Sequence, residues 1–185
     1  MAAPAKTSNA AIVTAAREIL ELVGPDQFGL DDVARAVGVR TPSLYKRFFA
    51  RASLLAALEK HGFDELAVLL TERNRDDDHL VSMANAYRDF ARRSPQLYAR
   101  MLAPDATRTE ESEQWRRAAV APVLKAIGTL VGPARALTAA RAVTAFLHGF
   151  VSMESAGAFR LGGHIDRDFA LALRMVLDGI VAHKA

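Results

Sequence analysis

The chain has 185 residues, of which 51% are hydrophobic, and it carries 24 Lys and Arg against 21 Asp and Glu, for a net charge of +3. This composition supplies a sizeable core and excludes a wholly disordered chain, while the absence of cysteine excludes a disulfide framework and a thiolate metal site. No segment reaches about 18 uninterrupted apolar residues and the N-terminus lacks the apolar region of a signal peptide, so we expect a cytoplasmic protein without a membrane partner.

Apolar residues recur at helical spacing along nearly the whole chain, and no stretch shows the alternation of a strand. The pattern predicts an all-α fold of about nine helices. The first begins after Ser8 and ends at the Gly-Pro pair 24–25, and the others lie at about 30–37, 41–48, 52–73, 79–94, 96–103, 112–131, 134–160 and 167–183. A polar run at 74–79 and the stretch 103–105 separate helices, and Pro122 predicts a kink or break.

The segment VARAVGVRTPSLYKRFF, residues 33–49, has the skeleton of a helix-turn-helix. Ala34 is small enough for a second helix to cross close to it, and Gly38 ends the first helix in a left-handed conformation. Leu44 anchors the second helix, and Thr41 is placed to cap it. We expect a small N-terminal domain at 1–52 and a larger domain at 53–185.

The second helix of this motif carries a basic, polar outer surface. No acid stands between Asp32 and Glu59, whereas this stretch holds Arg35, Arg40, Lys46, Arg47 and Arg51. With Leu44 turned inward, a step of about 100° per residue turns the neighbouring polar side chains outward. These groups donate to phosphates and base edges in the major groove of double-stranded DNA. The expected DNA-facing set is Arg40, Thr41, Ser43, Tyr45, Lys46 and Arg47.

From AAREILELVGPDQFGLDDVARAVGV through TPSLYKRFFARASLLAAL the sequence resembles the TetR family of bacterial transcriptional regulators. The resemblance implies a three-helix DNA-binding domain, a phosphate contact from Arg51, and repression as the usual mode. There are departures: Arg47 stands where many members have histidine, Ala50 where they have a capping residue, and Leu30 where a Thr or Ser often touches the DNA backbone.

The segment RAVTAFLHGFVSMESAGAF, residues 141–159, resembles the C-terminal domain of a TetR subgroup named for a Trp-His-Gly pattern. His148 and Gly149 are retained, and Phe146 or Leu147 stands near the expected tryptophan.

The family resemblance implies a homodimer built on the last two helices, and an apolar stripe on the last helix favours the same arrangement. Two recognition helices would then lie one turn of DNA apart, about 34–36 Å, so the operator would be an inverted repeat. The expected dimer residues are Phe150, Gly157, Phe169, Leu173, Val176, Leu177 and Ile180.

A pocket for a small hydrophobic or amphipathic effector is expected among the fourth to eighth helices. An effector that prefers the wrongly spaced dimer would weaken DNA binding. The candidate lining residues are Met83, Tyr87, Phe90, Tyr98, Met101, Trp115, Phe146 and His148. For each of these residues, ordinary core packing is the competing interpretation.

Two other functions fit the sequence less well. One is a dimeric DNA-binding protein without an effector, although residues 63–185 are far more than dimerisation needs. The other is a metal-dependent helical enzyme, with His61, Asp64 and Glu65 at i, i+3, i+4 spacing. No nucleophile-base-acid set and no glycine-rich phosphate loop stands out, so we expect no catalytic residues, no metal and no cofactor.

Overall fold

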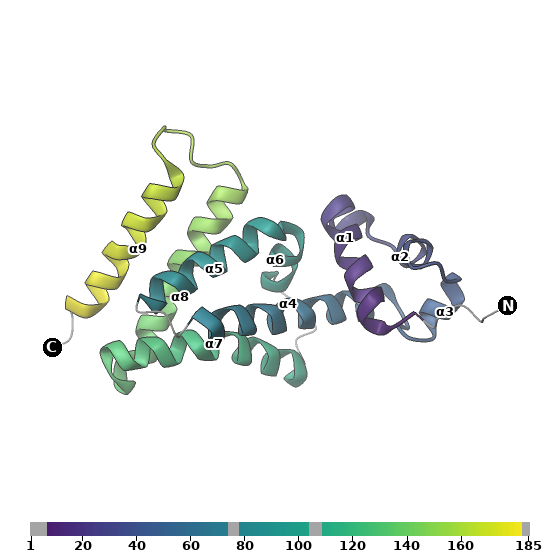
Figure 1. The fold of residues 1–185 in the computed structure, drawn as a ribbon, viewed down its shortest axis with the longest axis horizontal. Helices are drawn as coiled ribbons and strands as arrows, with labels where there is room; N and C mark the ends of the chain where they lie inside the picture. Colours follow the sequence, from purple (N-terminus) through teal and green to yellow (C-terminus); the bar gives the residue numbers. More distant parts are fainter. Residues whose placement is uncertain (1–6, 74–77, 104–108, 183–185) are drawn as a thin grey trace. The chain divides into compact units, whose positions relative to one another are not determined.

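The computed structural model describes residues 7–73, 78–103 and 109–182, and within these ranges it consists of helices and turns without a strand (Figure 1). The helices of the described residues are α1 Asn9–Gln27, α2 Leu30–Ala36, α3 Thr41–Tyr45, α4 Arg51–Arg73, α5 His79–Arg93, α6 Pro95–Leu102, α7 Glu110–Val131, α8 Pro133–Ser155 and α9 Ile165–Ala182. The all-α prediction is confirmed. The polar run predicted at 74–79 and the break at 103–105 lie largely outside the described residues.

The described chain forms two compact units. The first contains the residues up to Phe63 together with those from Ser94 onward on α6, and the second contains 64–93 and the residues from Thr109 onward. Helix α4 therefore contributes residues to both units. The first unit is discontinuous in sequence, because it includes α6. The two domains expected from the sequence, 1–52 and 53–185, were each continuous.

In the first unit, α1 packs on α2 and on α6, and α2 packs on α3. The Ser8 hydroxyl accepts a hydrogen bond from the Ala11 amide at 3.1 Å and so caps α1 as predicted. The helix is interrupted at Gly24, where φ is +74°, so the Gly-Pro pair produces the expected break and a last short turn follows it.

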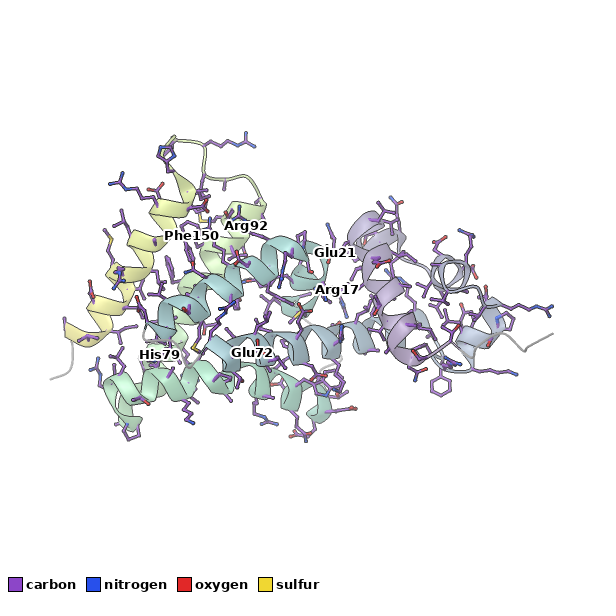
Figure 2. All side chains as sticks on the ribbon, viewed as in Figure 1. Arg17, Glu21, Glu72, His79, Arg92 and Phe150 are labelled. Atoms are coloured by element: carbon purple, nitrogen blue, oxygen red, sulfur yellow. The ribbon has the colours of Figure 1, made fainter. Side chains whose placement is uncertain are left out.

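Two charged side chains of α1, Arg17 and Glu21, make hydrogen bonds at the contact with α6 (Figure 2). The Glu21 carboxylate accepts hydrogen bonds at 3.0 Å from the amides of Gln96 and Leu97, in the first turn of α6. Arg17 donates to the Ser94 hydroxyl at 2.6 Å. A carboxylate at a helix N-terminus satisfies amides that have no partner inside the helix, so Glu21 fixes the start of α6 on α1.

In the second unit, α8 packs against α5, α7 and α9 (Figure 1). Helix α7 begins with a capping box between Thr109 and Ser112. Of the kink or break predicted at Pro122, the break does not occur, since the helix continues to Val131. Helix α8 ends at Ser155, earlier than the predicted 160, because the chain turns at Gly157 with φ of +63°.

Helix α8 is unusually apolar for a helix of which so few residues are buried. Among the described helices, it alone is long and apolar enough to cross a bilayer by length and composition, yet only 28% of its most apolar stretch is buried. Contacts with three neighbouring helices are typical of a core helix in a folded unit. Most of this apolar stretch is therefore not buried within the unit.

Candidate nucleic-acid interface and effector cavity

The predicted turn between α2 and α3 is present. Gly38 has φ of +69°, its amide donates to the Arg35 carbonyl at 3.2 Å, and the Val39 amide donates to Ala34 at 2.9 Å. Ala34 and Leu44 are buried, as the close helix crossing requires. The geometry of the motif is therefore that of a helix-turn-helix.

Helix α3 is shorter than predicted. It starts from Arg40, whose carbonyl accepts the Ser43 amide at 2.8 Å, so Thr41 lies inside the first turn and the prediction that Thr41 caps the helix is wrong. It ends at Tyr45, not at 48, because the chain passes through a turn at Lys46 and buries the ring of Phe48.

The outward positions predicted for this helix are largely exposed. Arg40, Ser43, Tyr45 and Lys46 are exposed, and Thr41 is half-buried. Leu44, in their midst, is buried and holds the helix against the unit. Side-chain donors and one aromatic ring therefore face solvent next to a fixed turn.

Arg47 and Arg51 have partners within the unit that the sequence did not reveal. The Arg47 guanidinium donates to the Thr7 carbonyl and, at 3.4 Å, to Asn9 Oδ1. The Arg51 Nε donates to the Phe28 carbonyl at 2.8 Å. A terminal nitrogen of Arg51 also donates to the Pro25 carbonyl, so this arginine fastens the connection between α1 and α2. Both residues add positive charge to the surface, and their hydrogen bonds to backbone carbonyls also stabilise the first unit.

Two departures from the family pattern have local explanations. Ala50 lacks a capping side chain, but the Ser53 hydroxyl accepts from the Ala50 amide at 3.3 Å and donates to the Ala50 carbonyl at 2.8 Å. A serine three residues into the helix is the signal that would have revealed this cap. Leu30 is buried, so its side chain serves the core.

A narrow apolar cavity of about 30 Å³ lies in the second unit, lined by residues of α4, α5, α7 and α8. Two of the candidate ligand residues, Met83 and Tyr87, line it together with Ala84, Val143 and Leu147. Known ligand pockets have about 300–1,000 Å³, so this cavity admits an effector only after its walls separate.

The other six candidate ligand residues do not line this cavity. Tyr98 and Met101 belong to α6 in the first unit. Phe90 is buried elsewhere in the core, Trp115 is half-buried, and His148 is exposed. Phe146 packs against Phe150 and Phe169, with ring centroids at 5.8 and 6.0 Å.

The expected dimer residues lie in several different environments. Phe169 and Leu173 are buried within the unit, and Phe150 joins the ring cluster. Val176 and Ile180 line a shallow hollow of about 320 Å³ on α8 and α9. Leu177 is half-buried and Gly157 is exposed. The large apolar side chains left exposed on these two helices are Leu137, Met153, Leu171, Met175 and Val181, and spacing alone did not single them out.

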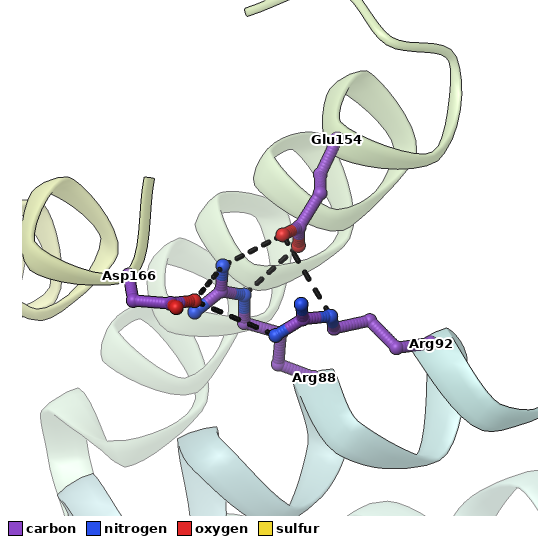
Figure 3. A network of polar contacts seen from close by, with 4 residues as sticks. All are labelled: Arg88, Arg92, Glu154 and Asp166. Atoms are coloured by element: carbon purple, nitrogen blue, oxygen red, sulfur yellow. Dashed lines mark hydrogen bonds and ion pairs between the residues drawn. The ribbon is translucent and has the colours of Figure 1, made fainter. Parts of the chain in front are cut away.

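An ion-pair cluster with a buried centre joins α5 to the end of α8 and the start of α9 (Figure 3). Arg88, with a side chain 5% exposed, donates from Nε and Nη2 to the two Glu154 carboxylate oxygens at 2.9 and 2.6 Å. The Arg88 Nη2 also lies 2.8 Å from Asp166, and its guanidinium carbon lies 4.6 Å from the Phe169 ring centroid. The hydrogen bond to Glu154 raises the pKa of Arg88 against the opposing effect of burial.

Arg92 completes this cluster from one turn further along α5. Its Nη1 lies 3.4 Å from Asp166 and its Nε 3.9 Å from Glu154 (Figure 3). Its half-exposed side chain makes these contacts weaker than those of Arg88. The cluster thus consists of Arg88, Arg92, Glu154 and Asp166, centred on the Arg88–Glu154 pair.

The metal-site hypothesis finds no support among the residues that the structure describes. His61, Asp64 and Glu65 occupy α4, and no group of three His, Asp or Glu side chains within the described ranges gathers to hold an ion.

Two family models match the chain. The model described as "Bacterial regulatory proteins, tetR family" matches residues 12–58, and "Tetracyclin repressor-like, C-terminal domain" matches 80–176. The second match does not confirm the Trp-His-Gly subgroup.

The chain is also similar to individual proteins. The uncharacterised HTH-type transcriptional regulator YobS of Bacillus subtilis (strain 168) is 31% identical over 175 residues, which are 92% of this chain and 91% of YobS. A protein of unknown function from Rhodococcus sp. RHA1 has a TM-score of 0.81 at 24% identity, covering 95% of this chain and 97% of that one. A TetR variant from Acinetobacter baumannii AYE in complex with minocycline has a TM-score of 0.70 at 21% identity, covering 97% and 99%. The chain therefore belongs to the TetR family of bacterial transcriptional regulators, which are DNA-binding proteins and not enzymes.

Proposed function

We propose that this regulator is a homodimeric repressor that binds an inverted-repeat operator and is released by a small hydrophobic or amphipathic effector. The single observation that carries the proposal is the exposed surface of α3 and its flanking bases Arg40 and Lys46, held by a helix-turn-helix in a chain whose second unit has its own apolar cavity. Residues 1–52 would read DNA and residues 53–185 would bind the effector and dimerise, in the cytoplasm, as is typical of the family.

The exposed side chains of α3, and those of the residues at its two ends, have the chemistry of DNA contacts. Ser43 and Tyr45 present hydroxyl groups that hydrogen-bond to base edges or phosphates, and Arg40 and Lys46 neutralise phosphate. Thr41 lies in the first turn, which is the part of a recognition helix that enters the major groove. Arg47 and Arg51 add positive charge at the edge of this surface, and both donate hydrogen bonds to backbone carbonyls of the first unit.

The exposed apolar side chains of α8 and α9 support a dimer with a second copy of the chain. Leu171 and Met175 stand one helical turn apart on α9, and both are exposed. Beside Met175, the hollow is lined by the small residues Ala142 and Gly179, which permit close approach of another helix. A two-fold pairing through this surface would repeat α3 at a fixed spacing, so the operator would be an inverted repeat.

The cavity of the second unit supports an apolar effector. Helix α5 lines it with Met83 and Tyr87, and the next residue, Arg88, is bound to Glu154 on α8. An effector that enlarges the cavity would therefore push α5 against the helices proposed for dimerisation. Because linkage is reciprocal, a ligand that favours the enlarged state must weaken operator binding if DNA selects the narrow state.

The first experiment is selection of genomic fragments on the purified protein. The expected result is enrichment of one inverted repeat by the wild type and its loss in Tyr45→Ala. Lys46→Ala should weaken binding to all fragments and lower the slope of log K against log salt by about 0.9. Enrichment that is unchanged in both variants would contradict the proposed DNA face.

The dimer and the effector are tested with the selected fragment. Met175→Asp places a charge on the proposed interface, so it should shift the protein toward monomer in sedimentation and weaken operator binding. Neutral apolar compounds should displace the fragment, and Ala84→Leu, which fills the cavity, should suppress this response. Displacement only by highly charged metabolites would contradict the proposed effector class.

The small size of the cavity favours one second candidate, a dimeric regulator that needs no effector. The same displacement experiment separates the two: if no compound of either class releases the fragment, the regulator without an effector is the better description.

A further inference from the structure

Two adjacent phenylalanines between α3 and α4 have opposite environments. The Phe48 side chain is buried with 8% of its surface exposed, whereas Phe49 is 83% exposed. Both lie in the turn that joins the end of α3 to the start of α4 at Arg51. The turn therefore directs one ring into the core and the next into solvent.

The exposure of Phe49 gains nothing for the fold. A ring in water forfeits the free energy that burial would supply, and any polar residue would serve a solvent-facing position in a turn. Single exposed apolar residues are common on proteins. What distinguishes Phe49 is its place: it lies in the turn after α3, four residues beyond Tyr45 and close in sequence to the exposed DNA-facing side chains.

The surroundings of Phe49 are basic. Lys46 and Arg47 precede it and Arg51 follows it, and no acidic residue occurs from 33 to 58. Tyr45, four residues earlier, is a second aromatic ring, with 47% of its surface exposed. A polyanion with apolar surfaces between its charges matches this combination, and duplex DNA is such a polyanion.

We propose that Phe49 contacts an apolar surface of the operator, either a thymine methyl group or the face of a deoxyribose, and so adds affinity that does not depend on salt. The inference rests on the proposed DNA-reading role of α3, to which it adds a residue. Phe49 lies in the sequence between α3, which is expected to enter the groove, and Arg51, a basic residue that is expected to contact phosphate. A van der Waals contact at this place would make binding depend on the sequence or the shape of the operator.

The test uses the full-length protein, the short duplex that the wild type selects, and a series of salt concentrations. Phe49→Ala should weaken binding by about fivefold to fiftyfold, because the ring loses its apolar contact, while the slope of log K against log salt stays that of the wild type. Lys46→Ala should lower that slope by about 0.9. This difference in slope separates an apolar contact from a phosphate contact.

Leu22→Ala is the matched control, because Leu22 is 84% exposed on α1 and lies outside the basic stretch. It should bind the duplex like the wild type. Phe49 contributes little to the core, so Phe49→Ala should keep the thermal midpoint of the wild type, and circular dichroism checks this point.

A duplex in which uracil replaces thymine distinguishes the two apolar surfaces. If Phe49 meets a methyl group, the wild type should lose affinity for the uracil duplex and Phe49→Ala should not. If it meets deoxyribose, both proteins should be indifferent to the replacement while the loss caused by Phe49→Ala remains.

Three results would overturn the inference. If the wild type binds the duplex and Phe49→Ala binds it equally, the inference fails and the proposed function stands. If Phe49→Ala instead loses binding to phosphatidylglycerol vesicles with unchanged DNA affinity, the ring serves a membrane surface. If the wild type selects no duplex at all, the proposed function fails and the inference fails with it.

Discussion

Removal of the Glu154 carboxylate should destabilise the second unit far more than removal of any exposed charge. The Arg88 side chain is 5% exposed and that of Glu154 13%, and the two are joined by hydrogen bonds of 2.6 and 2.9 Å. In Glu154→Ala the guanidinium stays buried, and Asp166, which is 74% exposed, is the nearest remaining carboxylate. A buried charge without a buried partner is the main source of the cost.

The expected magnitude follows from this geometry. Breaking a buried ion pair by removing one partner costs about 3–5 kcal/mol, and the remaining contact with Asp166 favours the lower end, about 3 kcal/mol. In a chain of this length, each kcal/mol lowers the thermal midpoint by about 2–4 °C, so Glu154→Ala should melt about 6–12 °C below the wild type. Asp166→Asn should cost about 0–1 kcal/mol because water already screens its charge.

Urea denaturation followed by circular dichroism measures both variants. All proteins are compared at one protomer concentration, since dimerisation would add to the measured stability. Asp78→Asn is a further control, because Asp78 pairs with Arg174 at 2.9 Å where both side chains are largely exposed. Equal losses in the Glu154 and Asp166 variants, or a loss below about 1 kcal/mol in Glu154→Ala, would refute the reasoning.

Four further substitutions test helix caps and glycine positions, with Gly128 in the second unit and the other three in the first. Glu21→Gln should cost about 0.5–2 kcal/mol and speed hydrogen exchange at the first amides of α6, because the carboxylate cap is lost; unchanged exchange would contradict the cap. Gly62→Ala should destabilise by about 1–3 kcal/mol, because an added β-carbon would lie 2.6 Å from Met101 Sδ. At Gly128 the nearest atom to an added β-carbon is Ala136 Cβ at an ordinary 3.5 Å, so Gly128→Ala should instead stabilise its helix by about 0.5–1 kcal/mol. Thermal midpoints of the Gly62 and Gly128 variants that shift in the same direction in calorimetry would argue against this contrast. Ser53→Ala should cost about 1 kcal/mol in urea titrations by removing the cap of α4, whereas a neutral effect would show that the Ala50 amide is satisfied by water.

Sequence patterns predicted the helices well because their signals are local. Ser8, Gly24 and Gly38 act within a few residues of their own positions, and each has the predicted effect in the structure. The boundary errors are also local: α3 ends early because Phe48 turns inward, and α8 ends early at Gly157.

The side-chain contacts of the site were much less predictable. Arg88 and Glu154 are 66 residues apart in sequence, and no periodic pattern connects them. The same holds for Arg51, whose spacing marked it as a base on a surface but whose partners are carbonyls of the α1–α2 connection. Phe48 and Phe49 are identical in type and adjacent, so only the backbone path of the turn decides which of them is buried.

The discontinuity of the first unit has a consequence for synthesis. A chain that has been translated through Phe63 contains α1, α2 and α3 but lacks α6, which supplies the amides held by Glu21. At about 5–20 residues per second, the ribosome takes about 2–8 s more to add the residues up to 103. During that interval the nascent helix-turn-helix has an uncovered face on α1. A chaperone that binds emerging chains would meet the DNA-binding segment in this incomplete form, so slower translation between 64 and 103 should lengthen its exposure to proteolysis.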